Sequence, residues 1–89
     1  MIRITLMDTA EKHTTMKVEG RIVSDWIEVM ETEFKNLLAE GKIVALDLSE
    51  VTFVEPEGVH MIRGILDKGC VLSSCPLFIH HVLFTQITS

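Results

Sequence analysis

Apolar and polar residues alternate at the beginning of the chain. Every second position from 2 to 6 is apolar, namely Ile2, Ile4 and Leu6. A polar stretch over 8–13 follows, and Met16 and Val18 then resume the alternation before Gly20. A period of two residues is typical of a half-buried strand. The pattern therefore predicts two strands paired as an antiparallel hairpin, with Gly20 ending the second strand.

The next segment has the spacing of a helix. Its apolar residues recur on one helical face: Ile27, Met30, Phe34, Leu37 and Leu38. Ser24 stands at the position of an N-terminal cap, and Asp25 to Glu28 has the spacing of a capping box. Gly41 occupies the usual place of a left-handed C-terminal cap. We predict a helix between Ser24 and Gly41, and we expect Trp26 to widen its apolar face.

Strands and helices alternate in the second half of the chain. The run 43–48 is nearly all apolar, which is typical of a strand covered on both faces. Pro56 is expected to open a helix that Gly69 closes, because proline needs no N–H partner in the first helical turn. The run 70–72 predicts a fourth strand, and Pro76 begins a last helix.

The predicted order of elements is β-β-α-β-α-β-α. This order predicts an α/β fold with a mixed central sheet of about four strands, about three helices packed on it, and right-handed crossovers between the later strands. A length of 89 residues leaves room for a single domain, 1–89. The hydrophobic content of 47% suits a compact globular chain.

The charge balance excludes several classes of partner. The net charge is −5, and no window of the sequence concentrates Lys or Arg. Nucleic acid and anionic membranes are therefore poor candidate partners. No run has the composition of a membrane span, and Arg3 and Asp8 interrupt the start of the chain where a signal peptide would be apolar. We expect a cytoplasmic protein in which Cys70 and Cys75 are reduced thiols.

Two glutamates flank a proline in the segment Glu55-Pro56-Glu57-Gly58. Neighbouring carboxylates suit general acid–base catalysis, and His60 follows Glu57 at a spacing that allows a proton relay. The sequence offers no phosphate-binding loop and no nucleophile elbow beside them. Acidic residues at a helix start are accounted for by the helix dipole. We predict that the protein is not an enzyme.

Four potential metal ligands, Cys70, Cys75, His80 and His81, lie within twelve residues. Their spacing differs from that of zinc sites, in which cysteines lie two to four residues apart and histidines three to five. Adjacent histidines on a helix point about 100° apart. We therefore predict no metal site, and the sequence gives no sign of a cofactor.

Three segments carry a resemblance to a known family. "VEGRI" leads into the first predicted helix, "IVALDLSEVTFVEPEGVHMI" runs from the buried strand into the second, and "GCVLSSCP" leads into the third. With the order of elements, they resemble the sulphate transporter and anti-sigma factor antagonist (STAS) domain over 16–84. The resemblance implies a bacterial, non-enzymatic regulatory domain that binds a protein partner such as an anti-sigma factor with serine kinase activity.

The family's switch position differs in this chain. The resemblance implies a phosphorylated serine immediately before the loop glycine, whereas this chain has Glu57 before Gly58 and Pro56 in the preceding serine position. A carboxylate carries one negative charge, and phosphoserine carries about −1.5 to −2. We predict that the domain is not switched by phosphorylation at this position. Two alternatives stay open: Glu57 imitates the phosphorylated state, or the switch is lost.

A loop that precedes a helix start presents side chains on a rigid support. The predicted partner-binding surface consists of this loop and the outer face of the second helix: Val54, Glu55, Pro56, Glu57, Gly58, His60, Arg63 and Asp67. An alternative is that the same loop senses a small ligand or a nucleotide, although two glutamates disfavour an anionic ligand. A homodimer formed through the edge of the first strand is a further expectation.

Overall fold

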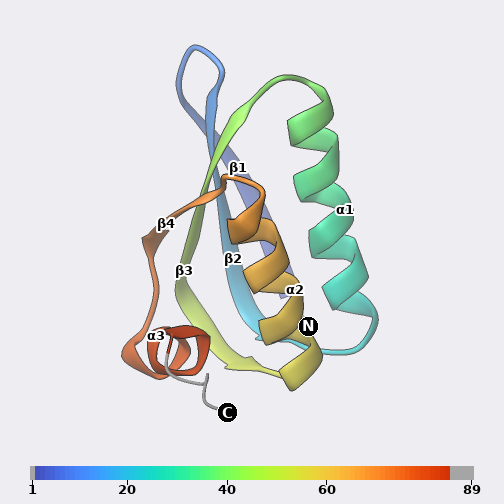
Figure 1. The fold of residues 1–89 in the computed structure, drawn as a ribbon, viewed down its shortest axis with the longest axis vertical. Coiled ribbons are helices and arrows are strands. Elements are labelled where there is room, and N and C mark those ends of the chain that lie inside the picture. Colours follow the sequence, from blue (N-terminus) through green and yellow to red (C-terminus); the bar gives the residue numbers. More distant parts are fainter. Residues whose placement is uncertain (1, 85–89) are drawn as a thin grey trace.

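The structure is a computed structural model, and it describes residues 2–84. Two helices lie side by side on one face of a four-stranded sheet, and a third lies at its edge (Figure 1). The elements in chain order are β1 (Ile2–Ala10), β2 (His13–Ile22), α1 (Asp25–Ala39), β3 (Ile43–Val54), α2 (Pro56–Asp67), β4 (Val71–Ser74) and α3 (Leu77–Phe84). This order is the predicted one.

The sheet is mixed, and its strands lie in chain order β1-β2-β3-β4. β1 pairs with β2 in antiparallel orientation, whereas β2–β3 and β3–β4 are parallel pairs. Parallel neighbours need a crossover connection, and α1 and α2 provide the two crossovers. The mixed sheet and its helices confirm the predicted α/β fold class.

The N-terminal hairpin is longer than predicted. Its turn contains only Glu11 and Lys12, rather than the whole polar stretch 8–13. The prediction that Gly20 ends the second strand is wrong, because β2 continues to Ile22. Gly20 has a φ of 102° and lies where the β2–β3 register shifts. The glycine therefore accommodates a bulge within the strand, which its sequence position alone does not distinguish from a strand end.

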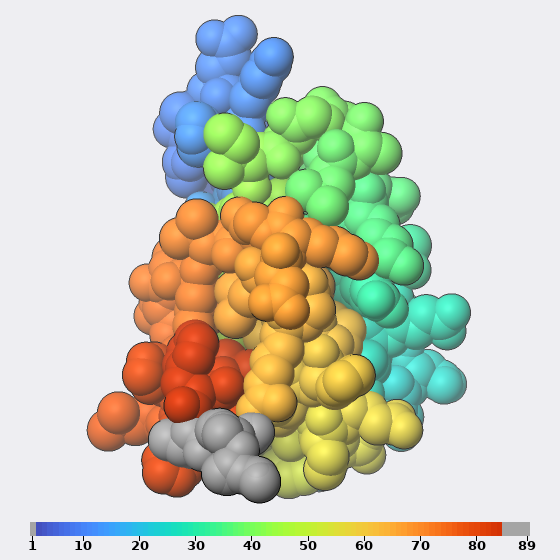
Figure 2. Space-filling view, in the orientation of Figure 1, coloured from blue at the N-terminus to red at the C-terminus, as the bar shows by residue number. Residues whose placement is uncertain are grey.

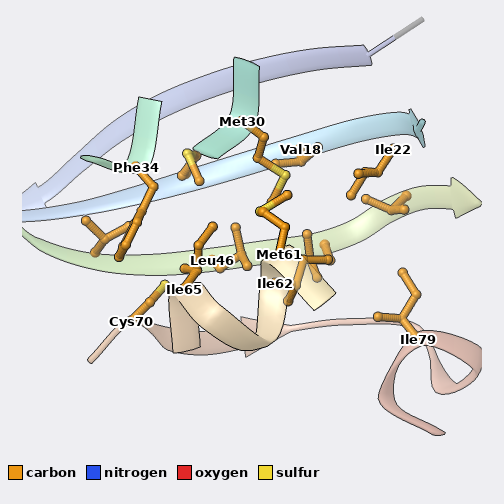
Figure 3. Packing of buried hydrophobic residues seen from close by; sticks show 14 of the residues in the cluster. Val18, Ile22, Met30, Phe34, Leu46, Met61, Ile62, Ile65, Cys70 and Ile79 are labelled. Carbon is orange, nitrogen blue, oxygen red and sulfur yellow. The ribbon is translucent and has the colours of Figure 1, made fainter. Parts of the chain in front are cut away.

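The hydrophobic core lies between the sheet and the two helices on one face of it (Figure 3). In β3, Val44, Leu46 and Leu48 are buried, while Ala45 and Asp47 between them are half-buried. The predicted coverage of this strand on both faces is therefore wrong. α1 and α2 share one face (Figure 1), so the strand alternates despite its apolar sequence.

The ends of α1 agree closely with the helix ends that the sequence predicts. In α1, Met30, Phe34 and Leu37 are buried as the spacing predicts, and Gly41 after it has a φ of 77°. The predicted side-chain cap is wrong, because the Ser24 side chain makes no capping hydrogen bond. Its backbone φ of 50° and ψ of −128° differ from the extended geometry of a capping residue.

The C-terminal elements begin slightly later than predicted. β4 starts at Val71 and α3 at Leu77, each one residue beyond the prediction. Ile79 and Leu83 are the buried residues of α3, and Phe78 lies exposed. None of the helices within residues 2–84 has both the length and the apolar character needed to cross a membrane.

Candidate functional site

The predicted site lies where β3 meets α2. We call the segment Val54–Gly58 the α2 loop. Val54 is the last residue of β3, Glu55 is the N-cap of α2, and Pro56 stands in its first turn. The segment lies at the carboxyl ends of the parallel strands β2 and β3, at the lower end of the molecule in Figure 1. The start of α2 is therefore fixed by the end of a central strand.

Glu55 links this loop to the turn between β2 and α1. Its carboxylate Oε1 accepts a hydrogen bond from the backbone N–H of Ser24 at 3.0 Å. Its own N–H donates to the carbonyl of Ile22 at 3.1 Å, and its carbonyl accepts from the N–H of Val59 at 3.0 Å. Glu55 is therefore engaged inside the domain, and it ties the start of α2 to a segment 31 residues earlier in the chain.

Glu57 has a different environment, although it lies two residues away. It is exposed in the first turn of α2, where a negative charge interacts favourably with the helix dipole. Its side chain makes no hydrogen bond or ion pair with any other described residue. Glu57 is therefore available to solvent or to a partner, whereas Glu55 is not.

Gly58 is buried at a close contact between α2 and the sheet. A Cβ atom at this position would lie 2.9 Å from Cγ1 of Val54 and 3.1 Å from Cγ2 of Ile22. These distances are shorter than ordinary van der Waals contact, so a side chain would push the helix away from the two strands. The glycine is explained by this close approach rather than by an unusual backbone angle.

The outer face of α2 combines exposed and engaged residues. His60 and Asp67 are exposed, and a rise of 1.5 Å per residue separates them by about 10 Å along the helix. Arg63 is half-buried: its Nε donates to the carbonyl of Leu83 at 3.2 Å, and Nη2 donates to the carbonyl of Val82 at 3.0 Å. Arg63 therefore fixes the last turn of α3 against α2.

A shallow hollow of about 290 Å³ adjoins the loop. Its lining residues are Val54, Pro56, Val59, Arg63 and Val82. Figure 2 shows α3 beside α2 at this end of the molecule. The volume is at the lower limit of ligand pockets, which span about 300–1,000 Å³. Sensing of a small ligand stays a prediction that the geometry does not test.

The four soft ligands near the C-terminus do not form a cluster. Cys70 is buried and Cys75 is half-buried, and both are free thiols. Burial raises the pKa of Cys70 to about 11, and burial also raises the pKa of Cys75. The His80 ring stacks on Phe84 with centroids 4.7 Å apart. Within residues 2–84, no three His, Cys, Asp or Glu side chains are placed to share a metal ion.

Sequence reasoning missed the residues that support the loop. Ile22 is the last residue of β2 and Ser24 precedes α1, and both contact the loop residue Glu55. No local pattern signals such a contact, because the partners are joined through the parallel pairing of β2 with β3. The sequence gives only an indirect signal. Two predicted strands each end shortly before a helix, and if these strands pair in parallel, the two helix starts lie at the same end of the sheet.

No family model matches the chain, and no curated protein does. Among solved structures, the chain is similar to an anti-sigma factor antagonist from Mycobacterium paratuberculosis, with a TM-score of 0.71 and 19% sequence identity. The match covers 83% of this chain and 68% of that one. A structure titled "Mglu" also matches, with a TM-score of 0.61 and 16% identity over 79% of this chain but 18% of its own.

A further similar structure is the anti-sigma factor antagonist SpoIIAA in its unphosphorylated form. It has a TM-score of 0.70 and 13% identity, and the match covers 92% of this chain and 83% of that one. Likeness at such low identity shows the fold alone. The chain therefore has the STAS-like α/β fold of the anti-sigma factor antagonists, as the resemblance of its sequence predicts.

Proposed function

We propose that this domain is a non-enzymatic regulatory module that binds a protein partner through the α2 loop and the outer face of α2. The observation that carries the proposal is the exposed Glu57 on a tightly held loop, in a domain with the fold of anti-sigma factor antagonists. The class of partner is an anti-sigma factor or a related serine kinase. Binding by such a partner requires no catalytic group on this chain.

The rigidity of the loop supports this role. Glu55 is held by hydrogen bonds to the β2–α1 turn, and Gly58 packs directly against Val54 and Ile22. A surface that is already ordered loses little conformational entropy when a partner binds. The loop therefore suits recognition by a partner without rearrangement.

The exposed charges of α2 lie on one side of the helix. At 100° per residue, Glu57, His60 and Asp67 fall within about 80° of one another. All three side chains are exposed. A partner that contacts Glu57 is therefore in a position to contact His60 and Asp67 along the same face, and Arg63 contributes indirectly by holding α3.

The domain is not regulated by phosphorylation of the segment 49–58. Glu57, immediately before the loop glycine, has no hydroxyl group to accept a phosphoryl group. Incubation with a cognate kinase, followed by mass spectrometry, is expected to show no phosphate on the segment 49–58. Phosphate on Ser49 or Thr52, which flank the loop, would contradict this part of the proposal.

Affinity capture with matched variants tests the interface. The bait proteins are the wild type, Glu57→Arg, Glu57→Ser and the control Glu50→Arg, an equally charged change at an exposed position of β3. We expect a partner that the wild type and the Glu50 variant both retain and that Glu57→Arg loses by at least about tenfold, as reversal of an interfacial charge does.

Glu57→Ser separates the two open explanations of position 57. If the carboxylate imitates a phosphorylated state, the serine variant is expected to change its set of partners. If the switch is simply lost, the serine variant is expected to retain the wild-type partners. Identical partner sets for wild type and Glu57→Arg would show that the α2 loop is not the interface.

A further inference from the structure

A second surface lies on the opposite side of α1 from α2, between α1 and the edge strand β1. Two hollows meet there, and together we call them the β1–α1 trough. The first, of about 380 Å³, is lined by Ile2, Ile4, Leu6, Trp26, Val29 and Glu33. The second, of about 490 Å³, is lined by Val23, Ser24, Asp25, Trp26 and Val29. Trp26 and Val29 belong to both, so the two hollows adjoin.

The trough exposes apolar side chains because α1 packs mainly on elements other than β1. Its main contacts are with β2, β3 and α2, and β1 is the edge strand of the sheet. Leu6, Trp26 and Val29 consequently keep 44%, 37% and 42% of their surface exposed. Adjacent exposed apolar side chains of this kind mark interaction surfaces more often than scattered ones do.

The charges around the trough identify the kind of occupant. Asp25 and Glu33 are among its lining residues, and those residues include no Lys or Arg. A second copy of this chain would bring like charges together, whereas a cationic segment would meet opposite charges. The complementarity therefore favours a basic partner over self-association.

We propose that the β1–α1 trough binds an extended segment of another protein, in which apolar residues and Lys or Arg lie on the same face of the strand. The outer edge of β1 carries backbone N–H and C=O groups that no strand within residues 2–84 pairs. A segment that adds to this edge aligns its alternate side chains on the helix side of the sheet. Its apolar residues then cover Trp26 and Val29, and a cation reaches Glu33.

Trp26 provides a direct measure of occupancy, since it is the one tryptophan of the chain. The probes are two synthetic nine-residue peptides in which every second residue is Thr. The positions between carry Val and Lys in one peptide and Val and Glu in the other, so that both kinds of side chain share one face of the strand. Titration of the Val–Lys peptide at physiological salt is expected to shift Trp26 emission to shorter wavelength, because the side chain leaves water. The Val–Glu peptide is expected to bind at least about tenfold more weakly.

Matched variants locate the binding site. Glu33→Lys changes the trough, and Glu50→Lys makes the same change of net charge on β3, away from the trough. We expect Glu33→Lys to weaken the Val–Lys peptide about tenfold and Glu50→Lys to leave it unchanged. Glu33→Gln, which keeps the shape of the side chain, is expected to act in the same direction with a smaller effect. Circular dichroism confirms that each variant is folded.

Strand addition has its own test. Methylation of alternate backbone nitrogens on the Val–Lys peptide removes the donors that face β1, and it is expected to abolish the Trp26 shift. Equal affinities of the Glu33→Lys and Glu50→Lys variants would overturn the proposal, as would the absence of any Trp26 response. A Trp26 shift that follows protein concentration alone, with a dimer in sedimentation, would assign the trough to a second copy instead.

Discussion

α2 and α3 are preceded by similar sequence signals, but their apolar side chains are buried to different extents. Each helix follows a strand of the sheet, and a proline precedes or opens each one. Four large apolar side chains of α2 are buried: Val59, Met61, Ile62 and Ile65. α3 is the more apolar segment in sequence, yet it buries Ile79 and Leu83 and exposes Leu77, Phe78, Val82 and Phe84. Position relative to the sheet, rather than apolar content, decides how much of each helix is buried in the core.

The largest expected effect distinguishes the two helices directly. Ile62→Ala removes a fully buried side chain from the core face of α2, and we expect it to lower the free energy of unfolding by about 3 kcal/mol. Leu77→Ala in α3 changes a side chain that is 85% exposed, and we expect a change within about 0.5 kcal/mol. Denaturant titration of both variants measures the difference. Comparable losses would mean that the outer side of α3 is covered in solution.

Two glycines within α2 provide a second comparison, in which smaller changes in the free energy of unfolding are expected. Gly58→Ala places a Cβ atom 2.9 Å from Val54, and we expect a loss of about 1–3 kcal/mol from overpacking. Gly64→Ala, in the same helix, meets no atom within 4 Å. It is expected to stabilise the domain by about 0.5–1 kcal/mol, because alanine favours a helix interior over glycine. Thermal unfolding of the pair measures both signs, and a stabilising Gly58→Ala would refute the close contact.

The two cysteines allow burial next to α2 and next to α3 to be compared without a substitution. Cys70 follows α2 and Cys75 precedes α3. Burial raises the pKa of Cys70 to about 11, so about one thiol in a thousand is ionised at pH 8. Burial raises the pKa of Cys75 as well, but this side chain is only half-buried. Alkylation by iodoacetamide, followed by mass spectrometry, is expected to label Cys75 first.

Labelling of Cys70 is expected to rise as the pH approaches 11, since only the thiolate reacts. Mild denaturant provides the control, because it exposes both thiols and equalises their rates. Equal rates in the native protein at pH 8 would show that α2 and β4 open readily at Cys70, contrary to the burial of that residue.

The order of elements could be predicted from the sequence because each signal was local. Pro56 marks the start of α2, and Gly41 and Gly69 follow the helix ends with positive φ angles. Gly20 shows the limit of this approach, since it carries the same signal but lies inside a strand. A glycine after a helix end and a glycine at a bulge within a strand both require a positive φ. Only the pairing of β2 with β3 shows that Gly20 is of the second kind.

The candidate site was predictable in position but not in detail. The sequence places Glu55 and Glu57 together at a helix start, and nothing local distinguishes them. Their difference arises from Ser24, whose N–H reaches Glu55 across 31 residues and leaves Glu57 exposed. The one-sided burial of β3 was missed for a similar reason, because the face chosen by α1 and α2 is a property of the whole fold.

The hydrogen bond between Glu55 and Ser24 has a practical consequence for protein engineering. The α2 loop is not structurally independent, since Glu55 supports a turn of unusual backbone geometry elsewhere in the chain. A transplant of the loop into a related scaffold therefore has to carry the β2–α1 turn with it. Conversely, a serine introduced at position 57 leaves this support intact, so a hydroxyl group can be placed there by one substitution.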